Sequence, residues 1–187
     1  MTLATWVLAL ASLVSLYVVY KGTREQAKNF EKQLAAYRLS LSADTTLKFD
    51  AAFNTPAFKK IRSSAAKALL SHTDETEAED VFDFFETVGL FVRLGALGEE
   101  VAYSLFFHWI NLYWRAGRNH IGSEQKEGAA IWHDFESIYK ALCKIERQKN
   151  LDSEDLKMPD QRLREQLQAE IELISTDRED GRSRASR

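Results

Sequence analysis

The sequence has few of the residues that form disulfides or tight turns, with one cysteine, two prolines and eight glycines in 187 residues. The single thiol, Cys143, excludes an intramolecular disulfide framework and a zinc site made of several cysteines. So few prolines and glycines leave few turns between short strands, which argues against a β-sandwich or a β-barrel. The formal net charge is only −3, so the chain is not a broadly basic nucleic-acid-binding protein.

Apolar side chains are plentiful, since 45% of the residues are hydrophobic and 11% are aromatic. They suffice for the core of one ordinary domain. Every strong hydrophobic period beyond residue 20 has helical spacing. We therefore predict an all-α fold in which residues 42–174 form a compact helical bundle of about six helices. Residues 175–187, which contain no apolar residue larger than Ala, are expected to be a disordered tail.

The first twenty residues contain an uncharged apolar run from Leu3 to Tyr20. As a helix these eighteen residues would be about 27 Å long, close to the thickness of the hydrocarbon core of a bilayer. A cleaved signal peptide would carry basic residues before the run, and none is present. A buried soluble helix fits neither the length nor the lack of charge. Residues 1–20 are therefore expected to be a retained transmembrane anchor that contacts membrane lipid through residues 3–20.

The charges that flank this run predict its orientation. No basic residue precedes the run. Five bases follow it closely, namely Lys21, Arg24, Lys28, Lys32 and Arg38. Basic residues are retained on the cytoplasmic side of membranes. We therefore expect the chain in the inner (cytoplasmic) membrane, with its N-terminus outside and its C-terminal domain in the cytoplasm.

Residues 21–41 are predicted to continue the anchor as a juxtamembrane amphipathic helix. Alternating steps of three and four residues place one seam on it, made of Leu13, Leu16, Tyr20, Thr23, Ala27, Phe30, Leu34, Tyr37 and Leu41. The part outside the bilayer (Ala27, Phe30, Leu34, Tyr37 and Leu41) either pairs with a second copy in a parallel homodimer or folds back onto its own domain. The spacing alone favours neither.

Within the domain, a short helix is expected over residues 42–54, with Leu47, Asp50 and Phe53 on neighbouring turns. Thr55 and Pro56 predict the start of the next helix, which places Arg62 on the outside. Further helices are predicted over residues 77–94 and over residues 99–115, the second being the central helix of the bundle. A connection is expected at Gly117–Gly122, and the next helix is expected to begin at Ser123. The last helix is predicted to begin at Asp152 or Ser153. The predicted core joins Phe85, Val88, Leu105, Trp109 and Phe135.

Three segments carry a family resemblance, and they occur in the order Phe53–Phe58 (FNTPAF), Val81–Leu90 (VFDFFETVGL) and Gly95–Trp114, which contains GALGEE and WINLYW. In these segments the chain resembles bacterial proteins grouped as the domain of unknown function number 4760, over roughly residues 20–150. The resemblance implies a helical, membrane-linked domain. It supplies no catalytic residue.

Isolated residues that could bind a metal or react have simpler structural interpretations. His133 and Glu136 share a helix face as in di-iron bundles, but one copy in reversed order indicates a solvated face. His108 is expected to be a hydrogen-bonded core or boundary residue. Cys143 has basic neighbours that favour the thiolate, yet its place beside Leu142 indicates a buried, unreactive thiol.

Charged clusters give no clear site either. The acidic run is interpreted as a solvated helix start rather than a cation or basic-partner site, and it comprises Asp74, Glu75, Glu77, Glu79, Asp80, Asp83 and Glu86. The arginines of the tail alternate with acids, so nucleic-acid binding is not expected.

No catalytic, cofactor-binding or metal-binding residue is assigned, and no cofactor is expected. The sequence favours a membrane-anchored interaction or scaffold module. The alternative is a membrane-tethered enzyme with a site assembled from residues such as His108, Glu99 and Glu100. Buried carboxylates or a deep polar pocket would favour that alternative.

Overall fold

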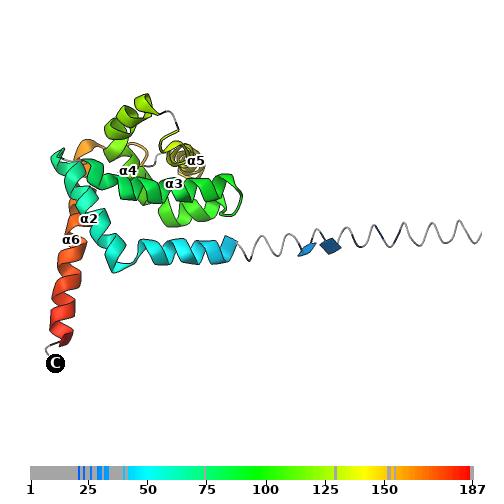
Figure 1. Cartoon of the computed structure of the whole chain (residues 1–187), viewed down its shortest axis with the longest axis horizontal. Helices are drawn as coiled ribbons and strands as arrows, with labels where there is room; N and C mark the ends of the chain where they lie inside the picture. The colour runs from blue at the N-terminus through cyan, green and yellow to red at the C-terminus, as the bar shows by residue number, and fades with distance from the viewer. Residues whose placement is uncertain are drawn as a thin grey trace, which may run out of the picture. The chain divides into compact units, whose positions relative to one another are not determined.

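The computed structural model describes residues 21, 23, 26, 29, 30, 32, 33, 40, 42–73, 75–128, 130–150, 153 and 155–185, with side chains as far as Glu172. Every regular element in these residues is helical, which confirms the predicted fold class (Figure 1). Residues 42–53 are helical and are followed by α2 (Pro56–Ser71), η1 (Glu75–Ala78), α3 (Glu79–Arg93), α4 (Glu99–Glu127), α5 (His133–Lys149) and α6 (Asp160–Ala185).

The chain divides into two compact units, residues 1–43 and residues 44–187. In the first unit the described residues between 21 and 40 are helical, and the side chain of Phe30 is 66% exposed. Among the described residues, no helix has the length and apolarity needed to cross a membrane. The predicted anchor at residues 3–20 lies outside the described residues, as do Ala27, Leu34, Tyr37 and Leu41 of the seam.

The start of α2 is as the sequence predicts. The Thr55 hydroxyl accepts a hydrogen bond from the backbone N–H of Phe58 at 3.1 Å, and Pro56 is the first residue of the helix. The preceding helical turns differ from expectation, because Leu47 is 69% exposed while Phe53 is buried and Phe49 packs against the core. Phe53 of the predicted stripe, together with Phe49 one position before Asp50, therefore attaches these turns to the domain.

Helices α3 and α4 form a hairpin whose connection uses glycine as predicted. Gly95 adopts the left-handed conformation (φ +71°) just after α3, and Gly98 precedes the first residue of α4. Phe85 contacts both Phe106 and Tyr113, while Phe82 lies against Gly117. These pairs show that the two helices run antiparallel.

The predicted connection at Gly117–Gly122 is wrong, because α4 continues without a break to Glu127. Gly117 is there for packing and not for a turn. A Cβ atom at this position would lie only 2.3 Å from Cζ of Phe82, so the absence of a side chain lets α3 approach α4 closely. The next helix, α5, consequently begins at His133 and not at Ser123.

The last helix also begins later than predicted. It starts at Asp160, directly after Pro159, while Ser153 lies in the connection that follows α5. The helix continues to Ala185, whereas a disordered tail was predicted from residue 175. The sequence of residues 175–185 offers no large apolar side chain to bury, and a helical segment of this length without such packing is marginal in water.

The core of residues 44–187 is dense in aromatic rings. Phe85 is the centre, with Phe135 stacked on it at 5.4 Å between ring centroids. Val88 is fully buried as well, so three of the five predicted core residues occupy the centre. Leu105 and Trp109 are only half-buried and pack at its edge.

Candidate functional site: a buried ion pair and a basic cleft

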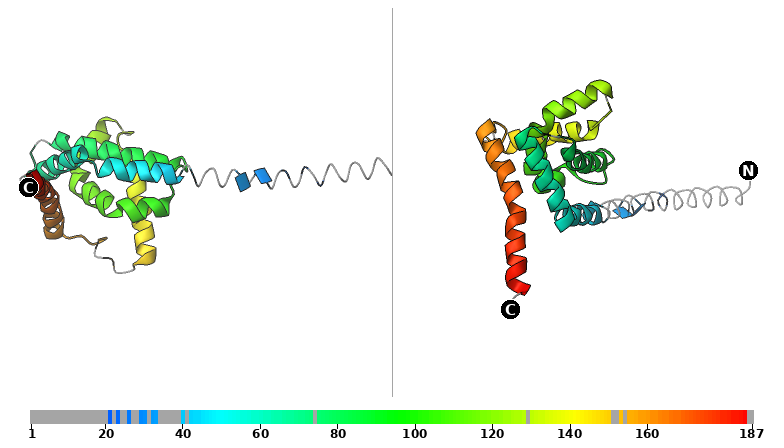
Figure 2. Two further views of the ribbon diagram at one scale, coloured as in Figure 1. Left: turned by 90° about the horizontal axis from the view of Figure 1, so that it is seen from below. Right: turned by 60° about the vertical axis from the view of Figure 1, so that its left-hand side comes forward.

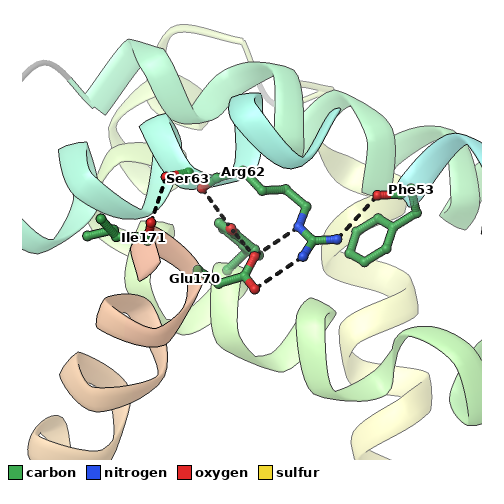
Figure 3. A network of polar contacts seen from close by, with 6 residues as sticks. Phe53, Arg62, Ser63, Glu170 and Ile171 are labelled. Carbon is green, nitrogen blue, oxygen red and sulfur yellow. Dashed lines mark hydrogen bonds and ion pairs between the residues drawn. The ribbon is translucent and has the colours of Figure 1, made fainter. Parts of the chain in front are cut away.

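A buried ion pair joins α2 to α6. Arg62, 3% exposed, meets Glu170, also 3% exposed, in a two-pronged contact. Its Nε donates to Oε2 at 2.8 Å and its Nη2 donates to Oε1 at 3.1 Å (Figure 3). The neighbouring Ser63 hydroxyl donates to the carbonyl of Ile171 at 3.5 Å. These pairs set α2 and α6 side by side. The two helices run antiparallel, because Leu69 near the end of α2 lines the same cleft as Leu163 near the start of α6 (Figures 1 and 2).

Further groups complete the surroundings of Arg62. Its Nη1 donates to the carbonyl of Phe53 at 3.2 Å, and the guanidinium lies 4.1 Å from the Phe53 ring and 4.6 Å from the Trp109 ring. The hydroxyl of Tyr113 lies 3.0 Å from the Arg62 carbonyl and 3.3 Å from Oε2 of Glu170. Burial, together with the negative charge of Glu170, raises the pKa of Tyr113, which keeps it a donor. A planar guanidinium suits this combination of forked pairing and ring contact.

The expectation that Arg62 faces solvent is therefore wrong. The partner that allows its burial is 108 residues away along the chain, which helical periodicity does not reveal. One signal was present: Arg62 and Glu170 each interrupt an apolar stripe, formed by Phe58, Ala65 and Leu69 in one helix and by Leu163, Leu167 and Ile171 in the other. Opposite charges that interrupt two apolar stripes are candidates for a buried pair.

Part of the acidic run holds the start of α5. The Glu86 carboxylate accepts the backbone N–H of Phe135 at 2.7 Å, and that of Asp83 accepts Nε1 of Trp132 at 2.7 Å. Trp132 precedes α5 with a left-handed backbone and supplies no side-chain cap, so Glu86 satisfies an N–H that the helix itself leaves free. The interpretation of the run as a solvated helix start is thus incomplete, because these two carboxylates position a neighbouring helix.

Two more contacts bring α3 and α5 together at this point. A Cβ atom on Gly89 would lie 2.3 Å from the carbonyl oxygen of Asp134, so glycine is required for the close approach. The Asp134 carboxylate receives Nε and Nη2 of Arg93 at 2.8 and 2.9 Å. Hydrogen bonds from Arg93 outweigh burial and hold the pKa of Asp134 below its usual value.

Glu146 on α5 is the third buried carboxylate, 4% exposed. It accepts hydrogen bonds from the Tyr103 hydroxyl and from Nδ2 of Asn150, the latter at 3.1 Å. Burial raises its pKa, but hydrogen bonds from Ser153, Tyr103 and Asn150 outweigh burial and lower the pKa overall. The hydrogen bond with Glu146 in turn raises the pKa of Tyr103 to about 12. Asp134, Glu146 and Glu170 thus each have partners that explain their burial structurally, and buried carboxylates here do not indicate an enzyme.

The residues proposed for an enzyme site are not brought together. Glu99 and Glu100 begin α4, and His108 lies eight or nine residues later, about 12 Å along the helix axis. All three are exposed, and Glu100 pairs with Lys149. The His108 ring lies 4.7 Å from that of Trp109, and partial burial lowers the pKa of His108, so this residue lies at the boundary of the domain and not in its core.

The other predicted positions have structural surroundings. His133 is exposed and Glu136 pairs with Lys140, in line with a solvated face. Cys143 is 5% exposed, and burial raises the pKa of its thiol, which favours the unreactive form. Within the described part of the chain, no three His, Cys, Asp or Glu side chains are grouped so that they could hold a metal ion.

One cleft has a different character from these structural contacts. It has a volume of about 250 Å³ and lies where the end of α2, the middle of α4 and the start of α6 meet. Arg115, Arg118 and Arg164 line it, against one lining carboxylate, Asp160. Sequence reasoning missed this cleft because its three arginines come from two helices that are distant in the sequence.

Comparison with known proteins identifies the family. The family model named domain of unknown function DUF4760 matches residues 2–142. The chain belongs to the DUF4760 family. The predicted resemblance is thus confirmed, and the match includes Arg62 and Tyr113 but ends before α6, which carries Glu170. No curated protein and no solved structure matches the chain.

Proposed function

We propose that this DUF4760 protein is a single-pass membrane protein whose helical domain is a cytoplasmic interaction module. The observation that carries the anchor is the uncharged run of eighteen residues, 3–20, followed by five bases within the next eighteen residues. The family match begins at residue 2, so this run belongs to the region shared with the family. Because charges flank it on one side only, the proposal includes a cytoplasmic C-terminus in the inner membrane.

A binding role rather than catalysis is supported by how the domain uses its polar groups. Each buried charged side chain takes part in a contact that joins two helices. Arg62 pairs with Glu170, Arg93 pairs with Asp134, and the Tyr103 hydroxyl donates to Glu146. The residues that the sequence offered for catalysis lie apart and exposed on α4. A rigid helical body with surface sites is well suited to recognition.

The juxtamembrane seam supplies the first interaction that we propose, a parallel homodimer through Ala27, Phe30, Leu34, Tyr37 and Leu41. In support, Phe30 leaves 66% of its surface exposed in the single chain, and an aromatic residue at a seam position gains by burial against a partner. Lys21, Arg24 and Lys28 would then lie near anionic headgroups, where each base favours membrane contact.

Anchoring is tested by separating membranes from the soluble fraction and washing them at alkaline pH, which strips peripheral proteins. The intact chain should stay in the membrane. A variant with Leu10→Arg and Leu13→Arg in the middle of the run should be released, because a charge at the centre of a helix disfavours insertion by about 3 kcal/mol. Release of the unmodified chain would contradict the proposal.

The homodimer is tested by disulfide crosslinking in membranes through single cysteines at positions 30, 34 and 37, in a Cys143→Ser background. We expect crosslinks at these three positions and not at the outward positions 32 and 36, which serve as matched controls. Absence of any crosslinking pattern would exclude the paired seam and leave the fold-back onto the same domain.

A further inference from the structure

The cleft between α2, α4 and α6 has the features of an anion-binding site. Within the described residues, Arg118 and Arg164 form no ion pair and are exposed. Arg115 is half-buried and is held by Asn111 and by the connection that precedes α6: its Nε donates to Oδ1 of Asn111 at 2.9 Å and its Nη2 to the carbonyl of Leu156 at 2.6 Å. Neither of these partners carries a charge, so the positive charge of Arg115 is not neutralised by them.

The charge balance at the cleft is the reverse of that of the whole chain. Three arginines line it against the single carboxylate of Asp160, whereas the chain carries a formal charge of −3. His72 also lines the cleft, and its Nδ1 lies 3.5 Å from Glu75. Positively charged side chains that line one cavity repel one another, and an anion bound between them would relieve that repulsion. Arginine also has the fork of donors that matches phosphate oxygens.

The size and remaining lining of the cleft narrow the ligand further. A volume of about 250 Å³ is below the range of roughly 300–1,000 Å³ typical of drug-sized ligands, so the ligand is small. Leu69 and Leu167 supply an apolar part of the lining. We propose that the cleft binds a small phosphate monoester, with the phosphate held by Arg115, Arg118 and Arg164 and a short carbon chain against the leucines.

This site goes beyond the proposed function and does not depend on it, because every residue named belongs to the unit of residues 44–187. It does depend on α6, which supplies Arg164 and Leu167 from beyond the segment matched by the family model. A phosphate monoester has two sources, a soluble metabolite or the headgroup of phosphatidic acid, and the experiment distinguishes them.

The test is titration calorimetry on the full chain in nonionic detergent, with inorganic phosphate and glycerol 3-phosphate as probes and glycerol as the neutral control. We expect both phosphates to bind and glycerol not to bind. Arg118→Gln and Arg164→Gln should each weaken binding about tenfold or more, the loss expected for one charge-assisted hydrogen bond. Arg147→Gln, which removes an exposed arginine of α5 away from the cleft, should leave the affinity unchanged.

The source is distinguished by repeating the titration in phosphatidylcholine nanodiscs with and without phosphatidic acid. Loss of glycerol 3-phosphate binding only when phosphatidic acid is present would identify the lipid headgroup as the occupant. Unchanged binding would identify a soluble monoester. The proposal is overturned if neither probe binds the unmodified chain, or if Arg118→Gln and Arg164→Gln together leave the affinity as it was.

Discussion

The buried ion pair between α2 and α6 gives the sharpest stability prediction. Changing Glu170 to Gln keeps the shape of the side chain but leaves the charge of Arg62 buried without its counter-ion. Removing one partner of such a pair typically costs about 3–5 kcal/mol. We expect a loss in this range, because Arg62 is only 3% exposed and its other contacts are a carbonyl and two rings, none of which carries a negative charge.

The assay is urea unfolding of the full chain in nonionic detergent, followed by tryptophan fluorescence. Three of the four tryptophans report on the helical domain, since Trp109, Trp114 and Trp132 all lie within residues 44–187. Glu165→Gln is the matched control, an identical substitution at an exposed position of the same helix, and it should change the free energy of unfolding by no more than about 0.5 kcal/mol.

The double variant Arg62→Met with Glu170→Leu separates pairing from packing. Replacing both charges of a buried pair by apolar side chains of similar size is often neutral or stabilising by about 1–4 kcal/mol. We therefore expect the double variant to recover most of the stability lost in Glu170→Gln. A loss below about 1 kcal/mol in Glu170→Gln would refute the reasoning, because it would mean that Arg62 reaches water or another counter-ion.

Two further predictions concern helix packing and pH. Gly117→Ala should destabilise the domain by about 1–3 kcal/mol, because its Cβ would lie 2.3 Å from Phe82. Gly122→Ala in the same helix is the control: its Cβ would have nothing within 4 Å, so it should stabilise the domain by up to about 1 kcal/mol. Equal changes in the free energy of urea unfolding would refute the packing role of Gly117. Asp134 has a lowered pKa, so its contribution to stability is present above its unfolded pKa of about 3.9 and is lost as the pH falls through the lower folded value. The gap in unfolding free energy between the unmodified chain and Asp134→Asn should therefore narrow from pH 6 to pH 3, and a constant gap would contradict this assignment.

Local sequence patterns predicted the helices better than their ends. The cap formed by Thr55 and the left-handed Gly95 depend on neighbouring residues only, and both are found as expected. Gly117 was misread as a break because its role depends on Phe82, 35 residues earlier and in another helix. The same limit applies to Arg62, whose counter-ion lies on a helix that no local window includes.

The candidate sites show this limit more strongly. Each residue of the basic cleft is unremarkable in sequence, since Arg115 and Arg118 follow the apolar centre of α4 and Arg164 lies on a mostly polar helix. Only the docking of α6 against α2 and α4 brings their charges to one cavity. The hydrogen bond from the Phe135 N–H to Glu86 could not be predicted either, because the acidic run was interpreted only as the start of its own helix, α3.

Membrane topology is the central claim, and a pair of reporter fusions at Arg187 tests it most directly. An export-dependent phosphatase is active only outside the cytoplasm, and a fluorescent protein that matures only in the cytoplasm gives the opposite signal. The account predicts an inactive phosphatase and a bright fluorescent fusion, both in the membrane fraction with residues 1–20 still attached. An active phosphatase with a dark fluorescent fusion, or a mature chain that begins after residue 20, would contradict it.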